Sequence, residues 1–357
     1  MTDVTVKNEE RAIFALRGLY RRYGYVPYKM SRFEEYDLYV RSRDFLVSDR
    51  IITFSDDRGR LLALKPDVTL SIVKNAPEEK GVVQKVYYNE NVYWDYREIM
   101  QAGLECVGDL GDYEIAEAVL LAVKSLELLG KNYVLDLSHM GLIAAVLESS
   151  GLESREQKLA MECIRRKNIQ ELEALCAENR EAWEKLSIFA YGRGDREFLE
   201  RAKRFLTTQA EQSAWEELKN IYTFLEDRGY ADHISIDYSV SSDLGYYSGV
   251  VFKGYLEGLH TGILSGGQYD TLPRKIGRNA RAIGFAVYLD LLQDMENAWE
   301  AFDVDTLILH DGSVERWILA DAAEEAAKDG SVLVASDLPR DRTWKKLVRF
   351  EKGVRVE

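Results

Sequence analysis

The segment VVQKVYYNENVYWDYREIMQAGLECVG (82–108) constrains the fold more than any other part of the chain. Its two ends, VVQKVYY and IMQAGLECVG, are rich in β-branched and aromatic residues and are typical of strands joined as a hairpin. A second pair of strand-like segments, IITF and LLAL, flanks the turn-rich loop SDDRGR. Strands joined by hairpins predict a mixed or antiparallel sheet rather than a doubly wound parallel one, and therefore an α+β fold.

Helices are expected around this sheet. Apolar residues at helical spacing predict an amphipathic helix over 8–24 and a strongly apolar one over 113–129. Pro66 opens a short helix, DVTLSIVKN. Further strands are predicted at NYVLDLSH, HISIDYSV, GYYSGVVFKGY and TGILSGGQYD, and AIGFAVYLDLLQDM is expected to be a strand that runs into a helix.

The composition changes twice along the chain. From about 153 to 228 the sequence is charged, with alternating Glu, Lys and Arg, and predicts a helical insert without strands. Residues 303–357 predict a small C-terminal α/β domain, in which DTLILH and SVLVAS are strands and 315–328 is an Ala-rich helix. The basic run RDRTWKKLVRF (340–350) is interpreted as a short basic helix or tail with a solvated face. We therefore expect a core domain over 1–302 and a small domain over 303–357.

The charge balance limits the classes of partner. The net charge of −14 argues against non-specific nucleic-acid binding, which needs clustered Lys and Arg. The three cysteines, Cys106, Cys163 and Cys176, form no zinc pattern, and the four histidines have no metal or triad spacing, so no metal or cofactor is expected. The start lacks the apolar region of a signal peptide and no apolar run is long enough to span a bilayer. A cytoplasmic protein without a membrane partner is expected.

One face of the predicted strand 99–108 carries polar side chains. Strand residues alternate between faces, so Gln101, Gly103 and Glu105 point the same way. A buried amide and carboxylate need hydrogen-bond partners, and a small ligand with an amine or imidazole would supply them, with Gly103 allowing its approach. On spacing alone, a solvated face explains the pair equally well.

Three other segments bear on this possibility. In KPDVT (65–69), the simplest role of Asp67 is to cap the helix that follows. In SGGQYD (265–270), the paired glycines indicate a bulge or close backbone approach, and no Walker-type lysine follows. In DLGYYSGVVF (243–252), Tyr246 and Tyr247 would point to opposite faces of a regular strand. At a strand entry, by contrast, one ring could line a pocket while the other offers its hydroxyl at the rim.

Taken together, five segments resemble the class II aminoacyl-tRNA synthetase core, and specifically the histidyl-tRNA synthetase family. LALKPDVTLSIVKN resembles the RPEGT segment, and KVYYNENVYW…YREIMQAGLECVG resembles the motif 2 hairpin. GYYSGVVF resembles RGLDYYTG, LSGGQYD resembles GGRYD, and AIGFAVYLDLL resembles the motif 3 sequence GFAIGLERL. The order and spacing agree over residues 8–300, and the resemblance implies a class II synthetase-like antiparallel sheet flanked by helices.

The resemblance fails where that family holds ATP. Its synthetases bind phosphates with arginines, because a bidentate guanidinium suits an oxyanion. The positions of four such arginines fall here on other residues, namely Trp94, Ser242, Gln268 and Leu291. The nearby cations Lys65 and Arg97 are the available replacements.

The resemblance retains the positions that would bind histidine, which are Asp67, Thr69, Gln101, Glu105, Tyr246 and Tyr247. This combination resembles the regulatory subunits of ATP phosphoribosyltransferase, a paralogous branch of that family. The implied protein is not itself an enzyme. It would activate a short-form catalytic subunit in the first step of histidine biosynthesis, sense histidine, and self-associate as a dimer within a hetero-oligomer. Two alternatives stay open: a divergent histidyl-tRNA synthetase or other amino-acid-activating class II enzyme, and a stand-alone module that binds another amino acid.

Overall fold

The computed structural model describes residues 7–41, 50–76, 79–191, 193–240, 246–294, 302–340, 342–352 and 354–356. The chain divides into two compact units, one over Ala12–Asp294 and one that combines Met1–Arg11 with Met295–Glu357. The expected domains over 1–302 and 303–357 stay a prediction, and this division differs from them in grouping Met1–Arg11 with the C-terminal part. Within the described residues, no helix is both long and apolar enough to cross a membrane.

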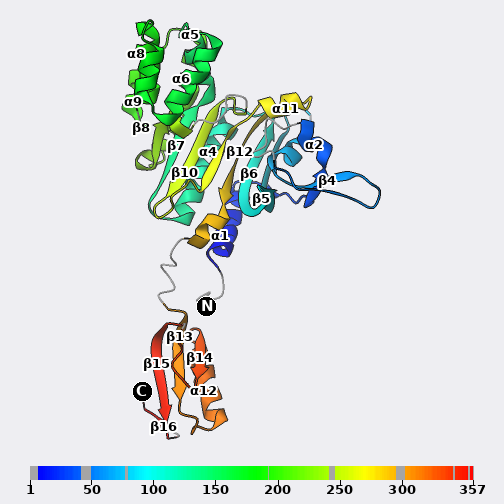
Figure 1. Ribbon diagram of the computed structural model, residues 1–357, viewed down its shortest axis with the longest axis vertical. Helices are drawn as coiled ribbons and strands as arrows, with labels where there is room; N and C mark the ends of the chain where they lie inside the picture. The colour runs from blue at the N-terminus through cyan, green and yellow to red at the C-terminus, as the bar shows by residue number, and fades with distance from the viewer. Residues whose placement is uncertain are drawn as a thin grey trace. The chain divides into compact units, whose positions relative to one another are not determined.

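A nine-stranded sheet dominates the larger unit (Figure 1). Its strand order is β1-β5-β6-β12-β11-β10-β7-β9-β8. All neighbouring pairs are antiparallel except β1–β5 and β7–β9, which are parallel. The strands are β1 (Val26–Pro27), β5 (Val83–Trp94), β6 (Arg97–Gly108), β7 (Tyr133–His139), β8 (Arg193–Gly194), β9 (Ile234–Asp237), β10 (Val250–Leu256), β11 (Leu264–Gln268) and β12 (Arg281–Tyr288). The mostly antiparallel α+β architecture agrees with the sequence-based expectation.

The hairpin of β5 and β6 is longer than the sequence suggested. The stretch NENVYWDYRE, interpreted as a connection, is strand up to Trp94 and again from Arg97. The two strands pair along their whole length and meet in a two-residue turn, Asp95–Tyr96, in which both residues have positive φ (48° and 61°). Positive φ at both central positions is the geometry of a type I′ turn. Because β5 and β6 pair with each other over their whole length, the strands extend into residues whose polarity had indicated a loop.

Helices cover one face of the large sheet. The α4 side chain Leu126 lies over Gly254 of β10, and the α1 side chain Tyr20 contacts Phe285 of β12 and hydrogen-bonds Ser125 of α4 at 3.0 Å. Because strand side chains alternate, the side chain of Glu105 points to the opposite face of the sheet. The helices of the larger unit outside the insert are α1 (Asn8–Arg22), α2 (Tyr36–Arg41), α3 (Thr69–Lys74), α4 (Asp112–Leu129), α5 (Met140–Ser149) and α11 (Thr271–Lys275). The predicted helix after β12 is the 3₁₀ helix η4 (Leu289–Asp294).

A second, three-stranded sheet has the order β2-β4-β3 and comprises β2 (Phe33–Glu35), β3 (Thr53–Ser55) and β4 (Leu61–Leu64). Strands β3 and β4 form the hairpin expected around SDDRGR. Strand β4 leads directly into Lys65 and the segment that carries Asp67.

The insert is helical, with one exception. Its helices are α6 (Ser154–Arg166), α7 (Ile169–Leu175), α8 (Arg180–Ala190), α9 (Arg196–Lys203) and α10 (Gln209–Glu226). The expectation of no strand here was wrong, because Arg193–Gly194 forms β8 and pairs with β9 at the sheet edge. Two residues are too few to produce a period-2 pattern.

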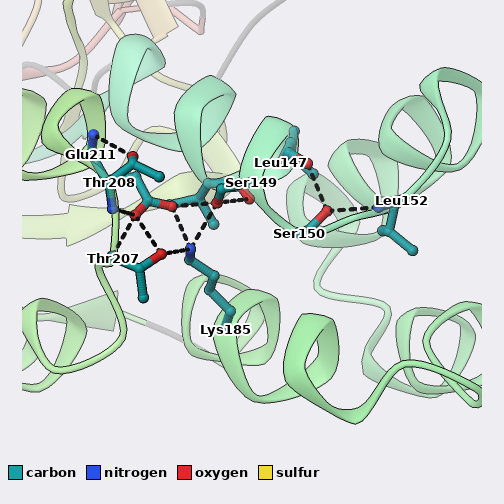
Figure 2. Close-up of polar contacts among 9 residues, drawn as sticks. Leu147, Ser149, Ser150, Leu152, Lys185, Thr207, Thr208 and Glu211 are labelled. Atoms are coloured by element: carbon teal, nitrogen blue, oxygen red, sulfur yellow. Dashed lines mark hydrogen bonds and ion pairs between the residues drawn. The ribbon is translucent and has the colours of Figure 1, made fainter.

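A buried ion pair joins α8 and α10 of the insert, and a hydrogen bond extends it to α5 outside the insert (Figure 2). Lys185 Nζ of α8 lies 2.5 Å from Glu211 Oε1 of α10, and both side chains are buried. Lys185 also donates to Ser149 Oγ of α5 at 2.7 Å, while Glu211 accepts the backbone N–H of Thr208 at 2.8 Å and so caps α10. The polar groups satisfy one another, as a buried charge requires.

The smaller unit contains a four-stranded sheet of order β14-β13-β15-β16, with α12 (Arg316–Ala327) packed on it. The strands are β13 (Val304–His310), β14 (Val332–Ala335), β15 (Trp344–Glu351) and β16 (Val354–Arg355). The interpretation of 340–350 as a basic helix or tail was wrong, because β15 pairs in parallel with β13 and buries Val348 and Phe350. Lysines at its exposed positions had obscured the alternation.

Candidate functional site

Glycines on neighbouring strands leave a recess in the face of the large sheet that α1 and α4 do not cover, and buried side chains of the chain itself fill it. Glu105 of β6 lies opposite Gly284 of β12, which lies opposite Gly267 of β11. A Cβ atom at Gly284 would be 1.7 Å from Oε2 of Glu105, and one at Gly267 would be 2.7 Å from the ring of Tyr247. The two glycines therefore make room for a carboxylate and an aromatic ring to lie flat across the strands.

Glu105 is the buried centre of this recess. It is 2% exposed and accepts hydrogen bonds from Thr69 Oγ1 at 2.7 Å and from the Tyr269 hydroxyl. Burial raises its pKa to about 8, although the two hydroxyl donors act in the opposite direction. The carboxyl group of Glu105 is thus largely protonated at neutral pH, and a cation placed beside it would favour ionisation.

Asp67 contributes a second, partly buried carboxylate. Its Oδ1 accepts the backbone N–H of Leu70 at 2.7 Å in the first turn of α3, which agrees with the capping role. Burial raises the pKa of Asp67 to about 6, against the opposing effect of the Leu70 and Thr69 backbone bonds. The charge on Asp67 also contributes to the raised pKa of Glu105, so the two acids lie close enough to interact. The capping role and a site role are therefore compatible.

Tyrosine rings enclose the two acids. Tyr246 and Tyr247 precede β10 rather than belonging to it, which resolves the question of opposite faces. Their rings meet edge to face with centroids 4.5 Å apart, and Tyr246 lies 6.0 Å from Tyr269. Burial raises the pKa of Tyr246 well above its usual range, with the neighbouring Tyr247, Asp67 and Glu105 adding to the effect. The hydroxyls around the acids are therefore neutral donors.

Gln101 lies on β6 four residues before Glu105, and its side chain points to the same face of the sheet. It is 6% exposed, and its cross-strand neighbours are Glu90 and Tyr288. Within the described part of the chain, no hydrogen bond is found for its side-chain amide. The solvated-face alternative is wrong, because Gln101 and Glu105 are both buried.

The space over Gly103 is already filled. A Cβ atom there would be 2.6 Å from the Tyr88 hydroxyl. Tyr88 of β5, rather than a ligand, thus lies over this glycine.

Three of the four positions without arginine lie in the described part of the chain, and Gln268 lies on a different face of the sheet from Leu291. Leu291 lines a pocket of about 390 Å³ on the Glu105 face, together with Ile99, Tyr288 and Lys253. Trp94 ends β5 beside the hairpin turn. Gln268 lies on the other face of β11, where it is buried and donates to Asp270 Oδ2 at 2.7 Å. It is therefore not part of the recess, since it alternates with Gly267 and Tyr269. Ser242 lies outside the described residues.

The two candidate replacement cations differ in their surroundings. Lys65 is 1% exposed and forms an ion pair with Glu90. Arg97 is exposed at the hairpin end. No group of three or more His, Cys, Asp or Glu suited to a metal ion was found in the described ranges.

Sequence reasoning missed Tyr269, Tyr88 and Gly284 as members of the recess. Tyr269 lies in SGGQYD, where the paired glycines drew attention away from it. Only one signal could have found Tyr269, namely its place two residues beyond Gly267 on an alternating strand. Gly284 and Tyr88 become informative only when the register of β5, β6 and β12 is known.

Comparisons with known proteins identify the family. The histidyl-tRNA synthetase family model matches residues 2–292. An ATP phosphoribosyltransferase regulatory subunit from Clostridium botulinum is 30% identical over 291 residues, which cover 77% of this chain and 69% of that protein.

Two solved structures share the fold. The first, an ATP phosphoribosyltransferase regulatory subunit/histidyl-tRNA synthetase from Bacillus halodurans, has a TM-score of 0.74 and 23% identity, over 96% of this chain and 94% of that one. The second is a chain of the ATP phosphoribosyltransferase (HisG:HisZ) complex from Thermotoga maritima. It has a TM-score of 0.62 and 18% identity, over 78% of this chain and 96% of that one.

Proposed function

The chain belongs to the ATP phosphoribosyltransferase regulatory subunits of the histidyl-tRNA synthetase family, and from this premise we propose that it regulates an ATP phosphoribosyltransferase without catalysing the reaction itself. Its partner would be a short-form catalytic subunit that carries out the first step of histidine biosynthesis. Histidine, the end product, would bind in the recess around Glu105 and contribute to feedback control.

The pair of Asp67, which is partly buried, and Glu105, which is buried, is the observation that supports the ligand proposal. Asp67 and Glu105 have pKa values of about 6 and about 8 because burial removes them from water. The present donors to these two acids are neutral hydroxyls and a backbone N–H, and the α-ammonium of an amino acid would add the positively charged donor that favours their ionised forms. The amide of Gln101 and the rings of Tyr246 and Tyr247 would complete the contacts to the amino acid.

The nucleotide side supports a non-catalytic role. Adenylate formation requires cations that stabilise the charge on the phosphates. Lys253 is the cation among the described residues that line the pocket next to Leu291, and Asp290 also lines it. Lys65 is engaged with Glu90. A pocket of this composition gives little stabilisation to a triphosphate.

The proposed sensing role requires histidine to favour one arrangement of the complex over another. Calorimetry with histidine, on the chain alone and with its catalytic subunit, tests the ligand. We expect binding to weaken at least tenfold in Gln101→Ala and Glu105→Ala, with matching relief of inhibition. Glu98→Gln, an exposed position on the same strand, is the matched control. Unchanged inhibition in both site variants would place the effector elsewhere.

The synthetase alternative makes a different prediction. Histidine-dependent exchange of pyrophosphate into ATP would be absent from a regulatory subunit. Phosphoribosyl transfer to ATP by the short-form catalytic subunit should instead rise when the chain is added. Robust exchange without such activation would overturn the proposal.

A further inference from the structure

A second pocket lies on the helix-covered face of the large sheet, away from the recess around Glu105. Its volume is about 240 Å³, and it is bounded by the start of α4, by α10 of the helical insert and by the ends of β11 and β12. Gln268, which faces away from the recess, is buried and lines it. Among the described residues, none of those assigned to the recess lines this pocket. The two cavities are therefore separate.

The wall of this pocket is apolar between the two helices. α4 contributes Ile115 and Ala116, and α10 contributes Ile221 and Phe224. Ile115, Ala116 and Ile221 are buried, and the ring of Phe224 is held by Arg228, whose guanidinium carbon lies 3.5 Å from the ring centre. Because drug-sized ligands occupy pockets of about 300–1,000 Å³, this smaller cavity suits a compact apolar group.

The same pocket is lined by two carboxylates, Asp112 at the start of α4 and Glu217 of α10. Among the described residues, no Lys or Arg lies within ion-pair distance of either one. Glu217 Oε2 instead lies 3.2 Å from Nε2 of His139. The backbone N–H of Leu142 donates to Nδ1 of His139 at 3.1 Å, which assigns His139 as the neutral tautomer with its proton on Nε2. This hydrogen bond lowers the pKa of Glu217, and the negative charge of Glu217 stays uncompensated.

Arg281 is the one cation among the described residues that line the pocket, and its charge is already engaged. Its Nη1 donates to the carbonyl of Leu110 at 3.0 Å, and its Nε lies 3.7 Å from Asp270 Oδ2. Gln268 donates to the same carboxylate at 2.7 Å and so helps to fix its position. The pocket therefore combines an apolar wall with an excess of negative charge.

We propose that this pocket binds a compact hydrophobic amine, with its apolar body between α4 and α10 and its ammonium group on the Glu217 carboxylate. The apolar body is removed from water, and a hydrogen bond between an ammonium group and a carboxylate is stronger than one between neutral groups. This binding site does not depend on the proposed regulatory function.

NMR titration of the full chain with benzylamine, benzyl alcohol and benzoate tests the chemistry, because the three probes share a ring and differ in charge. We expect saturable binding of benzylamine with a Kd on the order of 1 mM, as suits so small a ligand. Benzyl alcohol should bind at least tenfold more weakly, and benzoate should not bind. Equal affinity for the amine and the alcohol, or no saturable binding of the amine, would overturn the inference.

Two variants locate the amine. Glu217→Gln keeps an oxygen that accepts the bond from His139, and it should weaken benzylamine binding at least fivefold. The matched control is Glu216→Gln, which removes the same charge from the neighbouring exposed position of α10 outside the pocket. Its affinity for benzylamine should stay within twofold of the parent.

Parental affinity in Glu217→Gln, or an equal loss in the two variants, would overturn the inference. Weaker benzylamine binding in Glu105→Gln, with parental affinity in Glu217→Gln, would place the amine in the recess and likewise overturn it. Neither result would bear on activation of a catalytic subunit, which is measured separately.

Discussion

Thr69 and Glu105 lie 36 residues apart, and the Thr69 hydroxyl donates to Glu105 Oε1 at 2.7 Å. This bond joins the first turn of α3 to the centre of β6. It places Asp67, two residues before Thr69, near Glu105. The recess is thus assembled from a helix start and a strand that are distant in the sequence.

The raised pKa of Glu105 predicts how stability depends on pH. The folded state binds the proton of Glu105 more tightly than the unfolded chain does. The stabilisation of the fold by this proton is therefore complete below about pH 4.5 and is lost as the pH rises toward 8. Each tenfold difference in proton affinity corresponds to about 1.4 kcal/mol, so the free energy of unfolding should fall by on the order of 4 kcal/mol across this window. Urea unfolding at pH 5 and pH 8 measures it. Glu105→Gln, which imitates the protonated acid, should remove most of the slope, and an equal slope in both proteins would contradict the assignment.

Histidine binding should release protons. A bound ammonium lowers the pKa values of nearby carboxyl groups, so near pH 7 Glu105 should lose its proton when the ligand binds. We expect release approaching about one proton per histidine, and an affinity that increases from pH 6 to pH 8. Calorimetry in buffers of different ionisation enthalpy counts the protons. Binding with no buffer dependence would show that the ligand's cation does not reach Glu105.

Gly284 should not tolerate a side chain. A Cβ atom there would meet Glu105 Oε2 at 1.7 Å, and the carbonyl of Leu104 at 2.6 Å blocks an alternative position. Gly284→Ala should lower the free energy of unfolding by about 1–3 kcal/mol and weaken histidine binding. The matched control is Gly18→Ala in α1, where a Cβ meets nothing within 4 Å. That variant should be neutral or slightly stabilising. Equal behaviour of the two would contradict the role of Gly284.

Breaking the Lys185–Glu211 pair should strongly destabilise the helical insert. Burial acts to raise the pKa of Glu211. The hydrogen bonds that Glu211 accepts, of which the one from Lys185 has the largest effect, outweigh burial and lower the pKa to about 2. Lys185→Met leaves a buried carboxylate without its cation and should cost about 3–5 kcal/mol. Adding Glu211→Gln should recover part of that loss. Chemical denaturation of the parent and the two variants measures both effects, and a double variant as unstable as the single one would contradict the coupling.

The order of elements could be predicted because it depends on local chemistry. Alternation along 99–108 correctly grouped Gln101 with Glu105, and the hairpin around SDDRGR follows from its turn residues. The resemblance led to the family and its fold. Alternation applied to 265–270 would also have separated Gln268 from Tyr269, since adjacent strand residues face opposite ways.

Other features depend on contacts between distant segments. β15 was expected to be a helix or tail, because its lysines hide a pattern that only pairing with β13 reveals. The hydroxyl of Tyr269 reaches Glu105 only when β11, β12 and β6 lie in register. The raised pKa values of Asp67 and Glu105 arise from burial, which is a property of the folded chain as a whole. The sequence by itself thus determined which residues share a face and in which order the elements follow. The tertiary structure alone decided which faces are buried, because desolvation and hydrogen bonding across strands depend on packing rather than on neighbours in the chain.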